Sequence, residues 1–282
     1  MQKISNTKMN PIIFNGYQFQ KEKIPGLKSK VAKFIKKYGR KPCLVIFLGN
    51  DLNSKIFTSV KAKFGRKIGV VVKKIKIKNE KQLKILIDQT NESEEVDGVM
   101  IQLPILKRSK KQVLSIKQKE KTKDIINLID RNKDVDGMRK DSPFLPATVR
   151  AIREIMNYEL KIMNLKRKVI AVVGAHGWLG RKSVQMLREI GIGKIIEIGH
   201  GDTAASFDDL KHADVVISTV GKPGIITGDM LKNGCAIFDV GVGKGDIDFV
   251  STIKKASFVT PVPGGLGPAT ITCLFENLLS VI

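Results

Sequence analysis

The stretch Val169–Arg181, VIAVVGAHGWLGR, decides how the second half of the chain folds. Its first five residues are apolar and mostly β-branched, as in a buried parallel strand. Gly174, Gly177 and Gly180 follow at intervals of three, ahead of an amphipathic pattern that predicts a helix. A strand, a glycine turn and a helix together bring backbone N–H groups and a helix N-terminus against a phosphate. The GxxGxxG spacing departs from the dinucleotide-binding GxGxxG, so an ordinary βα turn of a parallel sheet also fits these glycines.

Apolar segments on either side extend the pattern. They predict strands at 194–198, 214–219, 235–240 and 257–260 in the second half, and at 43–48, 70–77 and 97–103 in the first. Helical patterns separate them, and the helix after residue 50 is expected to begin with Asn53 or Ser54 as its cap and to end at Gly69. Strands alternating with helices predict an α/β protein with parallel sheets, Rossmann-like in the second half.

Size and composition exclude several classes of protein. A chain of 282 residues that is 42% hydrophobic can bury the core of one large or two modest domains. It has no apolar run long enough to span a bilayer and no apolar signal core near its first residue. The cysteines Cys43, Cys235 and Cys273 are far apart and form no CxxC pair, which argues against a metal site or a disulfide framework. A cytoplasmic protein without a metal is expected.

The net charge of +23 allows two interpretations. Such an excess is typical of some nucleic-acid-binding proteins. Here the lysines and arginines are spread along the whole chain, and the denser patches at 30–41 and 107–123 contain no interleaved aromatic residues for stacking bases. The charge is interpreted mainly as a solvated, lysine-rich surface that also attracts polyanionic ligands.

Five sets of motifs follow one another in an order that resembles a known family. They are S-x-x-F-x-x-x-K-x-K at 54–63, DGVMIQLP at 97–104, KDVDG at 133–137, the turns GKPG at 221–224 and DVG at 239–241, and TPVPGGLGP at 260–268 followed by Thr270. Together they resemble the bifunctional methylenetetrahydrofolate dehydrogenase/methenyltetrahydrofolate cyclohydrolase family. The resemblance covers the chain from about residue 40 to the end, and the last motif is the most specific.

The resemblance implies two α/β domains with a cleft between them. Residues 1–142 and 263–282 are expected to form the folate-binding, catalytic domain, and residues 143–262 the Rossmann-like NAD(P)-binding domain. The implied activity is oxidation of 5,10-methylenetetrahydrofolate to 5,10-methenyltetrahydrofolate, followed by hydrolysis to 10-formyltetrahydrofolate. NADP is the expected cofactor, with NAD as the alternative, and a homodimer is the expected assembly. Neither a membrane nor a nucleic acid is an expected partner.

The resemblance also assigns site residues in the first half. It makes Lys61 the catalytic lysine, which a neighbouring aromatic ring and a closed pocket could make less basic. Gln102 would hydrogen-bond this amine without fixing its charge as a carboxylate does, and Asp136 would accept hydrogen bonds from the pterin. Phe57 stands where the family has tyrosine, so ring stacking on the folate survives but a hydroxyl beside the lysine is lost. The folate-binding set is Ser54, Phe57, Gln102, Leu103, Asp136, Pro263, Gly264 and Gly267.

The cofactor loop departs from the family pattern GRS-x-x-VG-x-P. Ala175 replaces the arginine that would face an adenosine 2′-phosphate, and Asp202 follows the next strand, where an acid favours a free 2′-hydroxyl. His176 is interpreted either as a phosphate contact or as a tolerated loop residue. His212 is expected on a surface helix. The cofactor-binding set is Gly174, Ala175, His176, Gly177, Gly180, His200, Thr219, Gly221, Gly241, Val242 and Thr270.

Two other functions stay open at this point. A dehydrogenase without effective hydrolysis would follow if Phe57 cripples the second step, and separate assays of the two steps would distinguish it. A noncatalytic nucleic-acid-binding relative would show salt-dependent binding of DNA or RNA and no NAD(P) binding. Such a protein would have no use for Lys61, Gln102 and Asp136 together.

Overall fold

A computed structural model describes residues 10–105, 122–160, 167–199 and 207–280. These residues form two compact units, which we name after their sheets. The six-stranded unit comprises the described residues through Lys21 together with Thr148–Thr270. The three-stranded unit comprises Glu22–Ala147 and the described residues from Ile271 onward.

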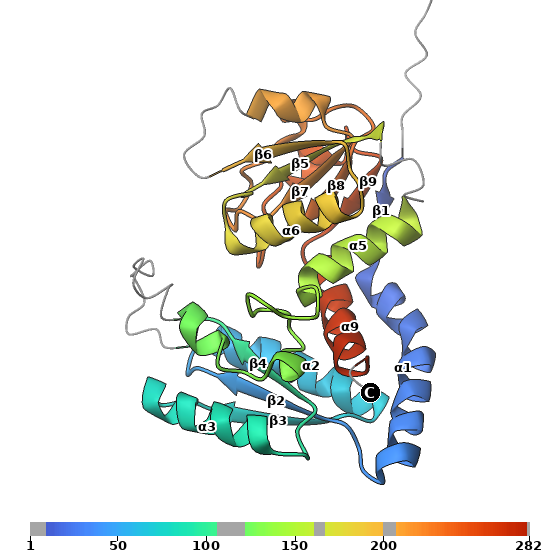
Figure 1. The fold of residues 1–282 in the computed structure, drawn as a ribbon. Helices are drawn as coiled ribbons and strands as arrows, with labels where there is room; N and C mark the ends of the chain where they lie inside the picture. Colours follow the sequence, from blue (N-terminus) through green and yellow to red (C-terminus); the bar gives the residue numbers. More distant parts are fainter. Residues whose placement is uncertain (1–9, 106–121, 161–166, 200–206, 281–282) are drawn as a thin grey trace, which may run out of the picture. The chain divides into compact units, whose positions relative to one another are not determined.

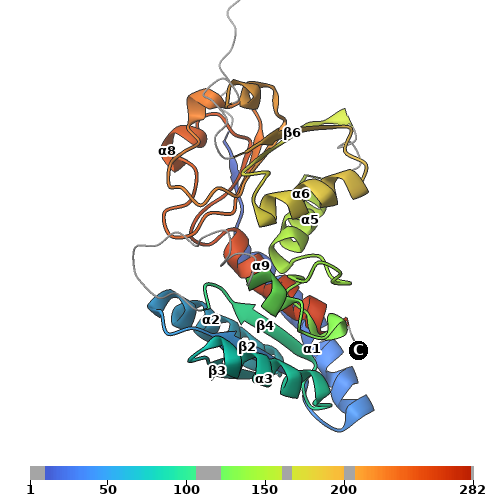
Figure 2. The ribbon, with the colours of Figure 1, turned by 60° about the vertical axis from the view of Figure 1, so that its left-hand side comes forward.

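The three-stranded unit is a parallel sheet between two layers of helices (Figures 1 and 2). Its strands are β2 (Cys43–Leu48), β3 (Val71–Lys76) and β4 (Gly98–Gln102), in the order β3-β2-β4. Its helices include parts of α1 (Gly16–Tyr38) and α9 (Leu266–Leu278), with α2 (Leu52–Ile68), α3 (Glu80–Glu92) and the short 3-10 helix η1 (Arg131–Lys133). The strand β2 is buried on both faces, so its sequence is continuously apolar.

Alternating side chains of β2 belong to two different cores. Leu44 and Ile46 pack in one cluster with side chains of α1, α2 and α9, whereas Val45 and Phe47 pack in another with Leu83 of α3. This alternation follows from the two-residue period of a strand. The edge strand β3 exposes lysines at 73, 74 and 76, which oppose edge-to-edge pairing and account for part of the basic surface.

Helix α2 begins earlier than the sequence indicated. The cap is Asp51, whose carboxylate accepts a hydrogen bond from the Ser54 N–H at 2.9 Å, rather than Asn53 or Ser54. Asn, Ser and Asp are all favoured as N-caps, so residue type alone could not decide among Asp51, Asn53 and Ser54. The expected end at Gly69 is confirmed, because this glycine has a φ of +94° and its N–H bonds the Arg66 carbonyl at 3.2 Å.

The six-stranded unit has the parallel, Rossmann-like sheet that the sequence predicts. Its strand order is β1-β9-β8-β7-β5-β6. The strands are β1 (Ile12–Ile13), β5 (Val169–Val173), β6 (Lys194–Ile198), β7 (Val215–Ser218), β8 (Ala236–Asp239) and β9 (Phe258–Thr260). The helical segments are α5 (Ala147–Glu159), α6 (Trp178–Glu189), α8 (Phe249–Thr252) and the 3-10 helices η3 (Asp209–His212) and η4 (Gly228–Met230). Figure 1 shows α6 lying across one face of this sheet.

Two segments expected in the first domain belong to the six-stranded unit instead. Strand β1 pairs with β9, with Ile12 opposite Phe258, and the Gly16 N–H bonds the Gly264 carbonyl at 2.8 Å. The residues through Lys21 are therefore held by this sheet, and so is the turn through Thr270. A two-residue strand carries too little periodicity to be recognised in a sequence. Among the described helices, none has both the length and the apolar character that a membrane span needs.

Candidate active site

In the three-stranded unit, a lysine and an amide predicted to work together are in direct contact. Lys61, on α2, donates a hydrogen bond from Nζ to Gln102 Oε1 at 2.7 Å. Gln102 is the last residue of β4, at the carboxyl edge of the sheet where ligands of α/β proteins bind. Its own Nε2 donates to the Leu103 carbonyl at 3.2 Å, which turns the amide oxygen toward the lysine. The sequence-based pairing of Lys61 with Gln102 thus has a matching geometry.

Asp136 shares an electrostatic environment with Lys61. Burial lowers the pKa of the Lys61 ammonium, and the Asp136 carboxylate acts in the opposite direction. Burial raises the pKa of Asp136 to about 6, with Lys61 opposing the shift and Asp134 adding to it. Both shifts move the pKa of the group toward neutral pH. Near neutral pH, such a group can gain or lose a proton readily. A partly buried amine and a partly buried carboxylic acid whose pKa values shift toward each other are suited to proton transfer.

The KDVDG loop that carries Asp136 is fastened by its other residues. Lys133 donates to the carbonyls of Thr90, Asn91 and Ser93 at 2.8–2.9 Å, which closes the C-terminal end of α3. The buried Asp134 carboxylate accepts the N–H groups of residues 138 and 139 at 3.2 and 2.8 Å. No described residue hydrogen-bonds the Asp136 carboxylate in this way. Lys133 and Asp134 therefore stabilise the conformation of the loop. The Asp136 carboxylate is not used in this way and can accept hydrogen bonds from a ligand.

Other predicted folate-binding residues of this unit have different surroundings. Ser54 is buried and its Oγ has no hydrogen-bond partner among the described residues. It lies two helical turns before Lys61 on α2, hence on the same face. Phe57 exposes 41% of its surface, so its ring is available to a ligand. Leu103 is half-buried and packs against the core on the α3 side of the sheet.

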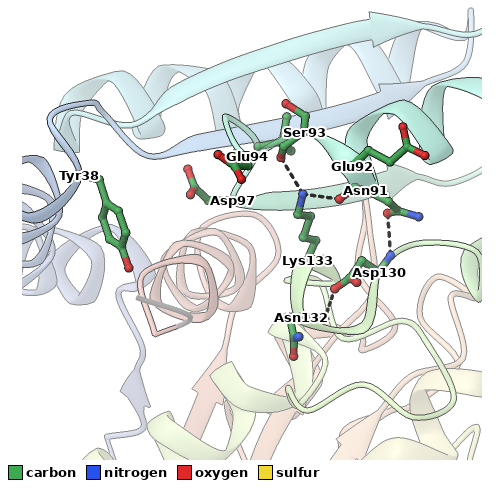
Figure 3. Close-up of a pocket in the computed structure, with 10 residues that line it drawn as sticks. Tyr38, Asn91, Glu92, Ser93, Glu94, Asp97, Asp130, Asn132 and Lys133 are labelled. Atoms are coloured by element: carbon green, nitrogen blue, oxygen red, sulfur yellow. Dashed lines mark hydrogen bonds between the residues drawn. The ribbon is translucent and has the colours of Figure 1, made fainter.

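A cavity of about 390 Å³ in the same unit is a different feature (Figure 3). It lies where Asp97 precedes β4, at the opposite end of this strand from Gln102. Its lining contains none of Lys61, Gln102 and Asp136; the lining residues are Tyr38, Asn91, Glu92, Ser93, Glu94, Val96, Asp97, Asp130, Asn132 and Lys133. Figure 3 shows the Lys133 ammonium directed at the α3 carbonyls rather than into open space. Asp97, another lining residue, forms a bidentate ion pair with Arg40, with two N–H···O bonds of 2.8 Å.

In the six-stranded unit, glycines bring the end of β5 and the start of α6 close together. A Cβ at Gly180 would lie 2.1 Å from the Gly174 carbonyl oxygen, and a Cβ at Gly174 would lie 2.7 Å from Thr219 Oγ1. Gly174 has a φ of +84°, which also favours glycine. The N-cap of α6 is Gly177, which makes no side-chain cap, so the first N–H groups of the helix can receive an anion. This cradle fits the pyrophosphate of a dinucleotide.

Two more turns lie at the carboxyl ends of neighbouring strands. Gly221 follows β7 with a φ of +70°, and a Cβ there would meet no atom within 4 Å. Gly241 and Val242 follow β8, and Val242 exposes 66% of its surface. Thr219 links this edge to the first turn, because its hydroxyl donates to the Val173 and Gly174 carbonyls at 3.0 and 3.3 Å. The predicted cofactor-binding residues at these turns therefore share one edge of the sheet.

The other predicted cofactor-binding residues that the structure describes are Ala175, His176 and Thr270, and their surroundings differ. Ala175 is completely buried and its N–H bonds the Ile198 carbonyl at 2.9 Å, so its predicted cofactor contact finds no exposed group of this residue. His176 is exposed and its ring covers Gly199, since a Cβ there would lie 2.1 Å from His176 Nδ1. The Thr270 hydroxyl donates to Thr148 Oγ1 at 3.5 Å.

Three predicted residues complete the comparison with the sequence. His200, like Asp202, lies outside the described residues. His212 is exposed at the end of η3, as expected of a surface helix. The predicted folate-binding residues Pro263, Gly264 and Gly267 lie in the six-stranded unit, where Gly264 has a φ of +99° and the other two are exposed.

Sequence reasoning missed two buried carboxylates of this unit. Asp246 accepts hydrogen bonds from the turn after β7, and Asp239 accepts them from the turn after β8. Asp239 was noticed only as part of the DVG motif. Asp246 lies in a glycine-rich stretch, GKGDIDF, that has no strand or helix period to indicate a buried face.

Comparisons with known proteins agree with this geometry. Residues 14–136 match the family model described as "Tetrahydrofolate dehydrogenase/cyclohydrolase, catalytic domain", and residues 146–282 match the corresponding "NAD(P)-binding domain". The chain is 31% identical over 278 residues to the bifunctional protein FolD of Staphylococcus haemolyticus, covering 95% of each.

Solved structures give the same result. A FolD methylenetetrahydrofolate dehydrogenase/cyclohydrolase from Campylobacter jejuni is 27% identical, with a TM-score of 0.81 and coverage of 95% and 96%. A 5,10-methylenetetrahydrofolate dehydrogenase from the silkworm Bombyx mori is 25% identical, with a TM-score of 0.84 and coverage of 96% and 97%. The matches span nearly the whole chain, and each family model covers one half of it. The chain belongs to the tetrahydrofolate dehydrogenase/cyclohydrolase family, with a catalytic domain and an NAD(P)-binding domain.

Proposed function

We propose that this protein oxidises 5,10-methylenetetrahydrofolate with NADP, or with NAD as the alternative, and hydrolyses the 5,10-methenyl product to 10-formyltetrahydrofolate. The observation that carries the proposal is the 2.7 Å hydrogen bond from Lys61 to Gln102, next to a carboxyl group of perturbed pKa. The family membership of the chain supports both steps. The contact of these groups also argues against a noncatalytic nucleic-acid binder, which would not need a partly buried amine held by an amide.

The hydrolytic step is assigned to the three-stranded unit. A water molecule adds to the methenyl carbon and loses a proton, which gives a hydroxyl on that carbon. The bond from the carbon to N5 then breaks: N5 takes up a proton, the hydroxyl loses its proton to become the formyl carbonyl, and one proton is released overall. Lys61, made less basic by burial, takes up the proton of the attacking water. Gln102 orients the amine through a neutral hydrogen bond that leaves it free to change protonation state.

Asp136 is assigned to folate recognition. Its carboxylate is the acceptor for the amino and ring N–H groups of the pterin. The ring of Phe57, exposed on the same helix as Lys61, stacks on the folate. Ser54, buried without a partner among the described residues, adds a hydroxyl on that helix face.

Cofactor binding is assigned to the six-stranded unit. The bound nicotinamide supplies a hydride acceptor for the bridging carbon of the folate. The turn Gly174–Gly180 and the N-terminus of α6 hold the pyrophosphate, and the turns at Gly221 and Gly241 allow backbone to approach the ligand closely. His176 and Thr270 remain proposed contacts in this scheme, and so do Pro263, Gly264 and Gly267 toward the folate.

Two spectrophotometric assays test the proposal. In the first, cofactor reduction is followed with NADP and with NAD on 5,10-methylenetetrahydrofolate. In the second, the decay of 5,10-methenyltetrahydrofolate is followed against the uncatalysed rate. Activity in both is expected, and absence of cofactor reduction with either nicotinamide would refute the dehydrogenase.

One observation favours a second candidate, a dehydrogenase with weak hydrolysis. Phe57 lacks the hydroxyl that the family's tyrosine places beside the lysine. Cofactor reduction without accelerated methenyl decay would establish this variant of the function. A homodimer and a cytoplasmic location remain predictions of the resemblance; light scattering on the purified protein tests the first, and fractionation of the source cells tests the second.

A further inference from the structure

Two buried carboxylates join the turns at the ligand-binding edge of the six-stranded sheet. Asp239 is the last residue of β8, and Asp246 follows seven residues later in the loop beyond Gly241. Both are at most 1% exposed. Neither is ion-paired with a lysine or arginine among the described residues, although the chain has 50 such residues.

Asp246 organises the turn after β7 through one oxygen. Its Oδ2 accepts hydrogen bonds from Ser218 Oγ at 2.7 Å, from the Val220 N–H at 2.9 Å and from the Gly221 N–H at 3.1 Å. Three donors from consecutive segments of one turn converge on a single carboxylate oxygen. Such convergence fixes a turn that otherwise has little packing, because Gly221 is exposed and surrounded by open space.

Asp239 organises the turn after β8 in the same way. Its carboxylate accepts the N–H groups of Gly241 at 2.8 Å, of Asp246 at 2.9 and 3.0 Å and of Ile247 at 3.2 Å. Its own N–H donates to Thr260 Oγ1 at the end of β9, at 2.8 Å. Asp239 therefore holds Asp246 in place, and Asp246 holds the turn after β7.

The packing around the second oxygen of Asp246 is equally tight. Oδ1 is buried without a partner among the described residues, and a Cβ at Gly241 would lie 2.7 Å from it. The Asp246 carboxylate thus fills the space beneath the turn after β8 while it binds the turn after β7. A side chain of another shape would move both turns at once.

We propose that Asp246, supported by Asp239, is a positioning residue for the dinucleotide, because it sets the conformation of the two turns that carry Thr219, Gly221, Gly241 and Val242. It does not contact the ligand; it acts through the backbone of these turns. This inference rests on the proposed function, in which those turns bind NAD(P). It predicts that Asp246 controls cofactor affinity separately from the hydrolytic chemistry of the three-stranded unit.

The test compares Asp246→Asn and Ser218→Ala with the wild type. The chain has one tryptophan, Trp178, which is the first residue of α6, so its fluorescence is the expected probe of dinucleotide binding. Asp246→Asn is expected to raise the dissociation constant for NADP at least tenfold and KM for the cofactor in parallel. Ser218→Ala, which removes one of the three donors, is expected to raise both about threefold. Hydrolysis of 5,10-methenyltetrahydrofolate and the KM for folate are expected to stay within twofold in both.

Asp248→Asn is the matched control. Asp248 lies two residues away and caps α8 by accepting the Ser251 N–H at 3.2 Å, with no bond to either turn. It is expected to lower Tm slightly without changing cofactor affinity. Unchanged NADP binding in Asp246→Asn would overturn the inference, and so would an equal loss of hydrolysis, which would indicate general unfolding. If Asp246→Asn does not fold, Ser218→Ala decides by the same criteria. A wild type that binds NADP but neither reduces it nor hydrolyses the methenyl substrate would refute the proposed function and leave this inference standing.

Discussion

The two units prepare their binding edges by opposite means. In the three-stranded unit, the groups of the proposed site are side chains: Lys61, Gln102 and Asp136. At the carboxyl edge of the six-stranded sheet, the groups that matter are backbone, brought forward by glycines such as Gly174, Gly180 and Gly221. The carboxylates differ as well: Asp136 has a pKa of about 6 and accepts no side-chain hydrogen bond from a described residue, whereas Asp239 and Asp246 each accept several N–H or O–H donors.

The difference follows from what we propose that each unit does. Proton transfer needs a group whose charge is unstable, so a site of this kind desolvates an amine and an acid together. Binding a dinucleotide needs fixed N–H dipoles, so a site of this kind uses its carboxylates to hold the backbone of its turns in place. Substitutions in the first region are therefore expected to change chemistry, and those in the second to change affinity.

The strongest test of this contrast is Lys61→Met. Methionine keeps the length and apolar stem but removes the amine, so hydrolysis of 5,10-methenyltetrahydrofolate is expected to fall by about 100-fold or more, while folate binding remains measurable. Lys63→Met, an exposed lysine on the same helix, is the control and is expected to leave hydrolysis unchanged. Wild-type rates of methenyl decay in Lys61→Met would contradict the assignment of Lys61 to hydrolysis. The contrast between a chemical site in the three-stranded unit and a binding site in the six-stranded unit would then fail.

Gly180→Ala tests the role of the backbone at the binding edge of the six-stranded sheet. Its methyl would lie 2.1 Å from the Gly174 carbonyl oxygen, so α6 must move away from the turn. We expect NADP to bind about tenfold more weakly and the unit to lose about 1–3 kcal/mol of stability, as overpacking typically costs. Methenyl hydrolysis should stay near the wild-type rate.

Gly26→Ala is the matched control for that substitution. Gly26 is exposed within α1, and a Cβ there meets nothing within 4 Å. An alanine at this site should stabilise the helix by about 0.5–1 kcal/mol without effect on either activity. If calorimetry and NADP titration gave the same result for both glycines, the close approach of α6 to the turn would have no functional meaning.

Some of this contrast could be predicted from the sequence, and some could not. The strands, the glycine turns and the pairing of Lys61 with Gln102 were predictable, because periodicity and motif residues carry them. The buried position of Ala175 was not, since a loop alanine has the same sequence signature whether it faces inward or outward. The strand at Ile12–Ile13 was missed because its only support is pairing with β9, far along the chain. The role of Asp246 was missed for the same reason, since its partners Ser218 and Gly221 are distant in sequence.

The pH dependence of folate binding tests the role of Asp136 in the three-stranded unit. With a pKa of about 6, Asp136 is ionised above that pH and protonated below it, and only the ionised form accepts two N–H donors. Folate affinity is therefore expected to fall about tenfold per pH unit as the pH drops below 6, and to level off above it. Asp136→Asn should bind weakly and lose this inflection, whereas Asp209→Asn, on η3 of the other unit, should retain it. Titrations at constant ionic strength measure this directly, and an inflection that persists in Asp136→Asn would have to belong to another group.

The smallest expected effect comes from Phe57→Tyr, and it distinguishes the two proposed functions. Phe57 is 41% exposed and lies one helical turn before Lys61, so a hydroxyl added to its ring is expected on the lysine's side of α2 at little packing cost. One hydrogen bond near the amine is worth about 0.5–1.5 kcal/mol, which predicts a rise of about 2- to 10-fold in the rate of methenyl hydrolysis. Cofactor reduction should not change, because a tyrosine ring stacks on the folate as phenylalanine does and the cofactor-binding groups lie in the other unit. A rise in hydrolysis alone would show that residue 57 sets the balance between the two steps. If neither rate changes, the hydrogen bond to Gln102 already orients the Lys61 amine fully. The protein then needs no tyrosine at position 57 to hydrolyse its product.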